Sequence, residues 1–523
     1  SEVLVSEKLL ENPSLFEGLN ALKERLTIQP HSLFDSQNAQ KRLETMFGVQ
    51  TLESFGAFSR AEIAAAGSLI DYVERTQKGK IPYLSAPQQV SMSGTMDIDA
   101  ATRRNLELIR TLNGERKGSL LSCIDKTLTA SGARLLQIRL SSPLSSKPEI
   151  DERLNQIAWF LEHRKEHESL NDALKAMPDI ERALGRLTAG RGGPRDLGQI
   201  KDGLYQAEQI RILIGQAKDF DAIQSVYEAL AQTPSVQELA DRLTAALKDE
   251  LPMLDREGGF IRKGFSQKLD ELRSLRDESK QHIANLQAQY KQKTGIDALK
   301  ISFNNVLGYF VEVPAKKADP LLVRKGEETT ADNPFIHRQT MANAVRFTTA
   351  ELAELERNMA QSSERSVAIE QEFFAQFLQQ VEQHVGDISR IAQAVAAIDV
   401  AAGLSTLARE QNYTRPSIEE SLAFDIKGGR HPVVEQALLK EQKSDFIPND
   451  CNLDPANRLW LLTGPNMAGK STFLRQNALI TIMAQIGSYV PADSAQIGIV
   501  DKVFSRVGAA DDLARGRSTF MVE

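Results

Sequence analysis

The chain has 523 residues, of which 41% are hydrophobic and 25% charged, and its formal net charge is −7. This composition is that of a globular protein and excludes global disorder, and the length is enough for about three or four domains. The acidic balance excludes an overall basic footprint, so any nucleic-acid binding has to be local. No apolar run approaches the roughly 18 residues of a membrane span.

Two cysteines, Cys123 and Cys451, are too few for a disulfide framework or a zinc site, and they fit a reducing cytoplasm. The first residues carry no basic stretch followed by an apolar one, so they do not read as a signal peptide, and there is no initiator methionine. We therefore expect the chain to be an excised piece of a longer protein.

The N-terminal half of the chain indicates two regions of different character. Residues 1–95 alternate strand-like pieces such as 2–6 with the helical periodicity of 61–74, which predicts a partial α/β domain. From 99 to about 292, apolar residues recur three and four positions apart, with breaks at prolines and glycines. This pattern predicts a large all-α region.

The next stretch predicts a helix, a small β module and a second helix. Residues 266–293 have the apolar stripe of one long amphipathic helix, and strand patterns follow at 299–303 and 308–313. Residues 349–402 are helical again and, as one continuous helix, would be about 80 Å long. The layout is that of a lever arm with a β tip. A coiled-coil hairpin with a decorative insertion fits the periodicity equally well.

Residues 413–523 predict the opening of an α/β nucleotide-binding domain, with a strand at 459–463, a loop, a helix at 472–487 and a second strand at 497–500. The loop beginning at Gly464 matches the pattern G-x-x-x-x-G-K-[ST] at every specified position.

The chemistry of phosphate binding explains this spacing. Backbone N–H groups of the loop and the N-terminal dipole of the following helix form an anion site. Lys470 would contact the β- and γ-phosphates, and the hydroxyl of Ser471 would bind Mg²⁺. The sequence therefore predicts a nucleoside triphosphate site.

The hydrolytic machinery is incomplete within the chain. A P-loop enzyme needs a Walker-B carboxylate at the end of an apolar strand, next to an acid or glutamine that positions water. Asp501 ends the apolar segment 497–500 but is followed by Lys502, so we interpret it as a solvated residue at a strand end. We expect the missing residues to lie beyond Glu523.

Two polar features remain. Residues 335–347 contain no acidic residue but carry Arg338 and Arg346 among amide and hydroxyl groups, which suits contacts to a phosphate backbone, although a solvated polar surface is the alternative. His163 and His167 lie one helical turn apart, a spacing that can bind metal, but no third ligand is evident, so we expect a solvated helix face.

Several of these motifs resemble the MutS family of bacterial mismatch-recognition ATPases. The matching segments are 464–472, 429–435, 505–513 and 516–523 around the phosphate loop, and 99–107, 294–297, 305–309 and 338–343 in the preceding regions. The resemblance covers essentially the whole chain.

The resemblance implies a multidomain α and α/β fold with four regions. They are a partial α/β connector domain at 1–95, a large all-α core or lever domain with long helices at 96–295 and 348–412, a small β clamp insertion at 296–347 that holds DNA, and a partial P-loop ATPase domain of ABC type at 413–523.

The resemblance also implies residue roles. Lys470 and Ser518 are carried over as catalytic residues, Ser518 reaching the γ-phosphate of the opposite subunit, and Ser471 as the Mg²⁺ ligand. The nucleotide-binding residues are Phe446, Gly464, Pro465, Asn466, Met467, Ala468, Gly469, Lys470, Ser471 and Thr472. The DNA-binding residues are Asn305, Arg338, Gln339, Asn343 and Arg346. Phe446 would stack on adenine, and the alternative role for it is that of an ordinary core residue. The alternative role for Ser518 is that of a helix N-cap.

Some family features are missing. The mismatch-reading Phe-x-Glu motif belongs to an N-terminal domain that this chain lacks, and the triplet 310–312 fits the pattern but lies in a clamp strand, where we expect a structural role. The Walker-B acids and a catalytic histidine are also absent. Ala468 and Arg515 stand where some relatives have glycine and serine, and neither should abolish binding.

The implied function is that of a DNA mismatch repair ATPase that clamps double-stranded DNA and couples mismatch recognition to ATP binding and hydrolysis. The implied cofactors are ATP and Mg²⁺. The implied partners are mismatched DNA, a second copy of the chain, a MutL-type protein and a sliding clamp. No membrane is implied, and the implied location is the cytoplasm, in association with the nucleoid. The alternatives are a MutS paralogue acting on recombination or stalled ribosomes, a more distant coiled-coil ATPase of DNA ends, and a non-hydrolysing nucleotide-gated scaffold.

Overall fold

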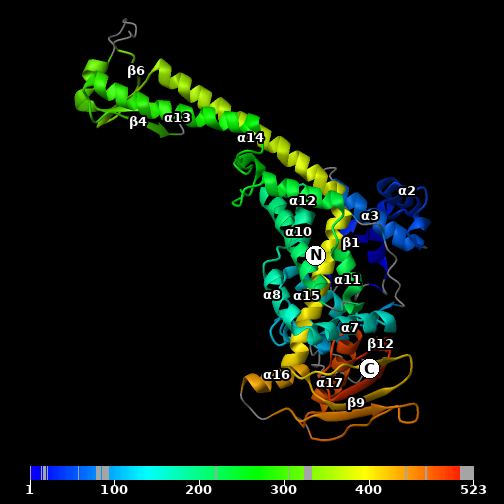
Figure 1. Ribbon diagram of the computed structural model, residues 1–523. Coiled ribbons are helices and arrows are strands. Elements are labelled where there is room, and N and C mark those ends of the chain that lie inside the picture. The colour runs from blue at the N-terminus through cyan, green and yellow to red at the C-terminus, as the bar shows by residue number, and fades with distance from the viewer. Residues whose placement is uncertain are drawn as a thin grey trace. The chain divides into compact units, whose positions relative to one another are not determined.

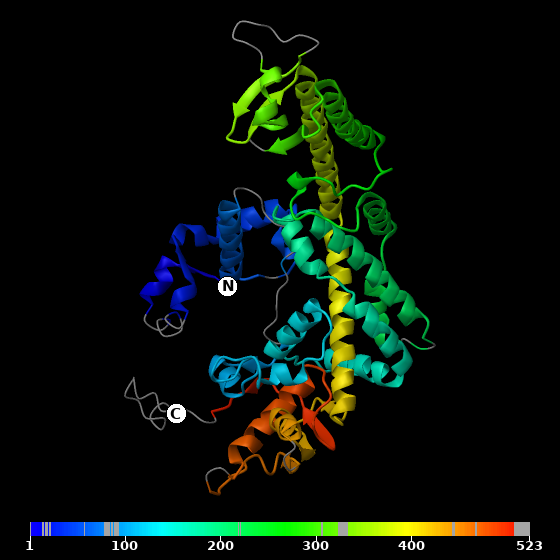
Figure 2. The same cartoon turned by 90° about the vertical axis from the view of Figure 1, so that its left-hand side faces the viewer.

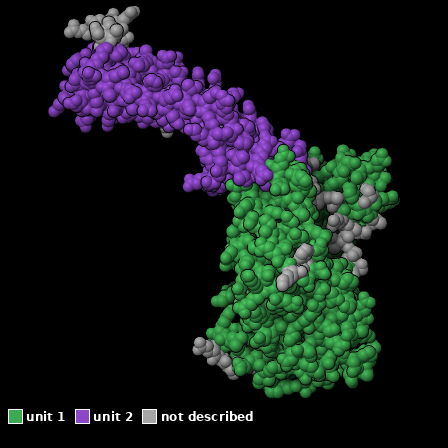
Figure 3. Space-filling model, viewed as in Figure 1, with its two compact units in different colours: residues 1–191, 199–238, 384–523 green, residues 192–198, 239–383 purple. Residues whose placement is uncertain are grey.

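The computed structural model describes residues 2–506 apart from 13–14, 16–18, 20–21, 57, 78–83, 85–86, 88–93, 218, 220, 305–306, 323–332, 442–444 and 466–467. The chain divides into two compact units (Figure 3). Unit 1 comprises residues 1–191, 199–238 and 384–523, and unit 2 comprises residues 192–198 and 239–383.

The N-terminal part of unit 1 is the small α/β region that the sequence predicts. Strand β1 (Val3–Ser6) pairs in parallel with β2 (Leu26–Gln29), and helices α2 (Ser36–Phe47) and α3 (Arg60–Thr76) follow. A capping box starts α3, because Ser59 accepts from the Glu62 amide while the Glu62 carboxylate accepts from the Ser59 amide.

A large helical region fills most of unit 1 and confirms the predicted all-α character. Its helices are α4 (Ala100–Asn105), α5 (Leu120–Ile124), α6 (Ala130–Ser141), α7 (Lys147–Glu162), α8 (Arg164–Lys175), α9 (Ile180–Thr188), α11 (Gln224–Leu230) and α15 (Val385–Glu410). Helices α10 (Pro194–Gly215) and α12 (Pro234–Ala246) lie partly in unit 1, and residues 194–198 and 239–246 of them belong to unit 2. Short 3₁₀ turns join several elements: η1 (Glu7–Glu11), η3 (Lys23–Arg25), η4 (His31–Phe34), η5 (Leu52–Ser54), η7 (Asp221–Ile223), η8 (Asp255–Glu257), η9 (Ala315–Lys317) and η10 (Asp319–Leu321).

Helix α15 is the central element of unit 1 and packs against α6, α7, α9 and α11 (Figures 1 and 2). Within the described residues it is the one helix long and apolar enough to cross a membrane, and 83% of its most apolar window is buried inside the protein. Such burial is that of a core helix in a folded domain.

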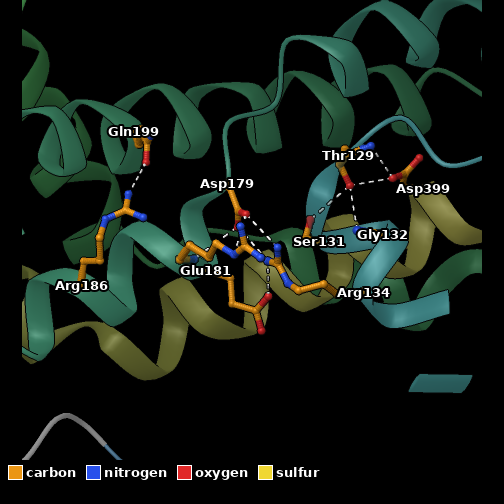
Figure 4. Close-up of polar contacts among 10 residues, drawn as sticks. Thr129, Ser131, Gly132, Arg134, Asp179, Glu181, Arg186, Gln199 and Asp399 are labelled. Atoms are coloured by element: carbon orange, nitrogen blue, oxygen red, sulfur yellow. Dashed lines mark hydrogen bonds and ion pairs between the residues drawn. The ribbon is translucent and has the colours of Figure 1, made fainter. Parts of the chain in front are cut away.

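A buried carboxylate fixes the start of α6 to α15 (Figure 4). Asp399 accepts from the Leu128 and Thr129 amides at 2.8 Å and from Thr129 Oγ1 at 2.6 Å. Thr129 Oγ1 in turn accepts from the Gly132 amide at 2.9 Å and caps α6. A Cβ at Gly132 would lie 2.1 Å from Asp399 Oδ2, so only glycine permits this approach.

Unit 2 contains the predicted pair of long helices with a β module between them. Helices α13 (Gln267–Thr294) and α14 (Ala350–Gln383) pack together. Strands β4 (Lys300–Asn304), β5 (Gly308–Pro314), β6 (Ile336–Thr340) and β7 (Ala344–Thr348) form an antiparallel sheet in the order β4-β5-β7-β6. Ile283, Leu352 and Phe347 belong to one buried cluster, so the sheet shares a core with both helices and is an integral tip rather than a decorative insertion.

The prediction of one continuous helix over 349–402 is wrong. Helix α14 ends at Gln383 and α15 begins at Val385, with His384 between them at φ −113° and ψ 17°. Gly386 lies beside the break, and glycine costs about 1 kcal/mol relative to alanine in a helix interior. Proline is the residue that most strongly predicts the end of a helix, and the sequence has none near His384, so it does not predict this break.

The C-terminal part of unit 1 is an α/β region. Its sheet has the order β10-β9-β11-β8, with β8 (Ser417–Glu419), β9 (Phe424–Gly429), β10 (Asn449–Leu453) and β11 (Ser494–Gly498). Helices α16 (Pro432–Lys440) and α17 (Lys470–Gln485) belong to this region, and β12 (Lys502–Val503) pairs in parallel with β3 (Asp97–Ile98).

The predicted strand at 459–463 is absent, although the segment is apolar. Leu459 and Leu461 are 85% and 87% exposed, and no strand within the described residues pairs with the segment. A strand persists only where a neighbour satisfies its backbone N–H and C=O groups, and pairing of this kind is not visible in local sequence. The predicted helix after the loop is confirmed as α17.

Candidate functional site

The predicted phosphate loop, which begins at Gly464, leads directly into α17. Gly469, the N-cap of that helix, has φ +90°, and Gly464 has φ +151°, both in the region that favours glycine. The first turn of α17 contains Lys470 and Ser471, so the positive end of the helix dipole and two donor side chains lie together. The Lys470 ammonium donates to the carbonyl oxygens of Gly464 at 2.5 Å and Pro465 at 2.6 Å.

A cavity of about 650 Å³ opens beside this loop and brings together residues that are far apart in the sequence. Of the predicted nucleotide-binding set, the cavity is lined by Phe446, Ala468, Gly469, Lys470 and Thr472. Its volume lies within the roughly 300–1,000 Å³ typical of small-molecule sites. Phe446 is half-buried at the cavity wall, which suits an exposed stacking surface better than ordinary core.

Two aromatic residues of this cavity were not found by sequence reasoning. Trp460 and Phe473 line it and stack on each other, with ring centroids 5.9 Å apart and planes 14° from parallel. Trp460 precedes the loop and Phe473 lies in the first turn of α17. The apolar run at 459–463 predicts a strand, and an aromatic side chain within a strand pattern does not by itself indicate a ligand surface.

Helix α16 also lines the cavity, through Val434 and Leu438. Its N-cap is His431, whose Nδ1 accepts from the Val434 amide at 3.3 Å. Burial, with a smaller contribution from the positive charge of Arg475, lowers the pKa of His431 to about 4. The imidazole is therefore neutral at physiological pH and is able to serve as an acceptor at the start of the helix.

Several predicted residues lie outside the described residues or away from the cavity. Asn466, Met467, Ser518, Asn305 and Arg515 fall outside the described residues. Asp501 is exposed, and its backbone oxygen accepts from the Asp97 amide at 2.7 Å, which agrees with its interpretation as a solvated residue at a strand end.

The predicted DNA-contacting residues of the β module differ in their surroundings. Arg338 is exposed and lies at a bulge between His337 and Gln339 in β6, a strand exposed along its whole length. Asn343 is exposed in the turn before β7. Gln339 Oε1 accepts from Arg346 Nη1 at 3.2 Å.

Arg346 is engaged within the sheet. Its Nε lies 3.1 Å from Glu312 Oε2, and its guanidinium lies 4.5 Å from the centroid of the Phe310 ring. Lys300 Nζ lies 3.3 Å from the other oxygen of Glu312. Phe310 is 3% exposed, so the structural role expected for the triplet 310–312 is confirmed.

The expectation of a solvated face for His163 and His167 is wrong. His167 is 2% exposed, lies 3.4 Å from both Ser405 Oγ and Thr406 Oγ1 on α15, and packs edge-on against Phe160. His163 stacks on Trp159 at 4.5 Å. Charged residues surround the two histidines in the sequence and obscure the apolar stripe of α8, on which His167, Leu170 and Leu174 are buried. In the described part of the chain, no group of three or more His, Cys, Asp or Glu residues is placed to hold a metal ion.

Comparison with known proteins agrees with this architecture. Residues 1–86 match the family model described as MutS domain II, residues 101–405 match MutS domain III, and residues 460–523 match MutS domain V. A relative from Rhizobium meliloti (strain 1021), described as DNA mismatch repair protein MutS, is 51% identical over 528 residues. That alignment covers 100% of this chain and 57% of the relative, so the chain spans little more than half of the relative's length.

The domain III match alone covers more than half of the chain, and the identity to the relative runs from one end of the chain to the other. Taken with the glycine-bearing loop at the start of α17 and the paired long helices that carry a β tip, these matches show that the chain belongs to the MutS family of DNA mismatch repair proteins.

Proposed function

We propose that this chain is the nucleotide-binding and DNA-clamping part of a mismatch repair ATPase. The observation that carries the proposal is the cavity of about 650 Å³ in which Lys470 and the loop glycine Gly469 meet the aromatic residue Phe446. A phosphate anchor at one end and an aromatic wall at the other are what an adenine nucleotide requires.

The residues fit ATP with Mg²⁺. Lys470 is bound to two carbonyl oxygens of its own loop, and phosphate oxygens, which carry full negative charge, make stronger charge-assisted hydrogen bonds than these neutral acceptors. Ser471 is exposed in the first turn of α17 and would supply its hydroxyl to Mg²⁺. Bound Mg²⁺ would neutralise charge that develops on the phosphates during hydrolysis. Phe446, Trp460 and Phe473 would hold the base.

The β tip of unit 2 is the proposed DNA clamp. Arg338, Gln339 and Asn343 lie on β6 and the following turn and are exposed. Their side chains are of the kind that would contact the duplex backbone and position the protein without reading the sequence. The proposed regions are those of the resemblance: 1–95 as connector, 96–295 and 348–412 as lever, 296–347 as clamp and 413–523 as ATPase.

ATP binding and DNA binding are proposed to be coupled. ATP shifts the protein between two arrangements only if it binds them with different affinity. Ser518 of a second copy would complete the site, which makes a homodimer part of the proposal. A MutL-type protein and a sliding clamp are the further proposed partners, in the cytoplasm and on the nucleoid.

The test is ATP turnover by the complete protein with homoduplex and with mismatched DNA. We expect turnover that depends on the DNA and is lost in Lys470→Ala. Equal turnover with both DNAs would contradict coupling, and turnover retained in Lys470→Ala would contradict the assignment of the loop. ATP binding without any turnover would instead favour the nucleotide-gated scaffold.

A further inference from the structure

The C-terminal end of α17 is fastened to the rest of unit 1 by one buried glutamine. Gln485 is fully buried. Its Nε2 donates to Leu144 O at 2.6 Å and to Val500 O at 3.0 Å, and its Oε1 accepts from the Val500 amide at 2.9 Å. Its backbone oxygen accepts from the Leu144 amide at 2.9 Å. One residue thus binds the turn between α6 and α7 and the segment after β11.

Arg153 of α7 reinforces the same end of the helix. Its Nη1 donates to Ile486 O at 3.1 Å, just beyond the last turn of α17, where a positive charge also complements the helix dipole. Gly487 follows with φ +79°, and a Cβ there would lie 2.4 Å from Arg153 Cβ. The backbone of α7 and the end of α17 therefore approach as closely as glycine allows.

The helix between the phosphate loop and this contact is a rigid body. Its 16 residues are about 24 Å long, and Leu479, Ile480 and Met483 on it are almost fully buried. These residues share one hydrophobic cluster with Leu136 and Leu140 of α6 and Leu154 of α7. A displacement at the phosphate end of α17 is therefore carried to Gln485 rather than absorbed along the helix.

A buried amide is unfavourable unless its polar atoms are bonded, and here Nε2 makes two hydrogen bonds and Oε1 makes one. An apolar residue at this position would leave the Leu144 carbonyl and the Val500 amide and carbonyl without this partner, so glutamine is what fixes both segments to the end of α17. We propose that Gln485, supported by Arg153, is the positioning contact through which phosphate binding at the N-terminal end of α17 moves the α6–α7 turn. This inference rests on the proposed function, because it names the residues by which the nucleotide site acts on the helical region.

The experiment measures DNA affinity of the complete protein with and without a non-hydrolysable ATP analogue, in the wild type and in Gln485→Met. Methionine keeps the length of the side chain and removes both polar atoms. Coupling factors are typically about 5- to 150-fold. We expect the variant to bind the analogue alone and DNA alone within about threefold of the wild type, with a coupling factor within about twofold of one.

Leu479→Ala is the matched control, because it opens a cavity on the same helix and leaves every contact of Gln485 in place. A purely structural role for Gln485 predicts that both variants reduce coupling alike, and that result would overturn the proposal. So would a folded Gln485→Met variant with wild-type coupling. If Gln485→Met does not fold, Arg153→Met tests the same contact. This substitution keeps the aliphatic part of the side chain against Gly487 and removes only the hydrogen bond to Ile486. Wild-type coupling in Arg153→Met would also overturn the proposal.

Amide hydrogen exchange of the wild type separates this inference from the proposed function. The analogue should change protection at the Leu144 and Val500 amides, the two that donate to Gln485. A change there without any effect on DNA affinity would refute the proposed coupling to DNA and support the contact as a relay. Unchanged protection at both amides when the analogue is bound would overturn the relay itself.

Discussion

Arg346 and Glu312 stand directly opposite each other on β7 and β5, and their side chains form an ion pair of 3.1 Å. This ion pair distinguishes the roles of Arg338 and Arg346, the two arginines that the sequence predicts to contact DNA. Arg346 neutralises a carboxylate of its own sheet, whereas Arg338 is exposed on β6 and has no ion pair within the described residues. The two side chains should therefore contribute differently to DNA binding.

For Arg338→Ala, we expect weaker binding to duplex DNA of any sequence. Each phosphate contact releases condensed counterions, so the slope of log K against log salt should become shallower by about one unit. Equilibrium titrations at several salt concentrations measure this slope. A loss of two units in the single variant, or of none, would refute this division of roles between Arg338 and Arg346.

Arg346→Ala should act mainly on the stability of the tip. Burial alone would raise the pKa of Glu312, but the bonds to Arg346 and Lys300 outweigh it and hold that pKa below the usual value. Removing the guanidinium leaves a half-buried carboxylate short of a partner, which costs roughly 1–3 kcal/mol. Chemical denaturation at pH 7 measures the loss.

The same pair gives a pH dependence of known sign. Because the pKa of Glu312 is lower in the folded state, its stabilisation is present above the ordinary pKa of 4.5 and is lost as the pH falls through the folded value. The stability difference between wild type and Arg346→Ala should therefore shrink at acidic pH. A difference that does not change with pH would show that the ion pair is not its source.

His431 should make the C-terminal α/β region of unit 1 sensitive to acid. Its pKa is about 4 in the folded protein against 6.5 for an unperturbed histidine, so its stabilisation is complete above pH 6.5 and is lost as the pH falls toward 4. The loss is on the order of 3 kcal/mol. Asparagine also caps helices and does not titrate. His431→Asn should thus flatten the pH profile of unfolding in this window, and an unchanged profile would exclude His431 as its origin.

Asp399→Asn should destabilise unit 1. Three donors converge on the carboxylate, two backbone amides and the Thr129 hydroxyl, and an amide NH₂ would face at least one of them. The expected loss is about 2–4 kcal/mol. Asp387→Asn on the same helix is the control, because its partly exposed ion pair with Arg390 is worth less than about 1 kcal/mol. Equal losses in the two variants would contradict the special role of Asp399.

Periodicity and one short motif were enough to predict much of this protein. The apolar stripe over 266–293 predicted α13, and the spacing of Gly464, Gly469 and Lys470 predicted a loop at a helix start. Such features are local, because a helix buries a face that its own sequence defines.

The features that were missed depend on partners distant in the sequence. The strand predicted at 459–463 needed a neighbour to pair with, and the burial of His167 depends on α15, more than two hundred residues away. The stacking of Trp460 on Phe473 and the ion pair of Arg346 with Glu312 likewise follow from spatial register, which local patterns do not carry.

The most direct test of the central claim is the affinity of the complete protein for duplex DNA at zero and at saturating non-hydrolysable ATP analogue, with Lys470→Ala as control. We predict that the analogue changes the dissociation constant by about fivefold or more in the wild type and leaves it unchanged in Lys470→Ala, which should bind nucleotide at least about 100-fold more weakly because a charge-assisted phosphate contact is gone. A wild-type dissociation constant that is the same with and without the analogue would contradict the account.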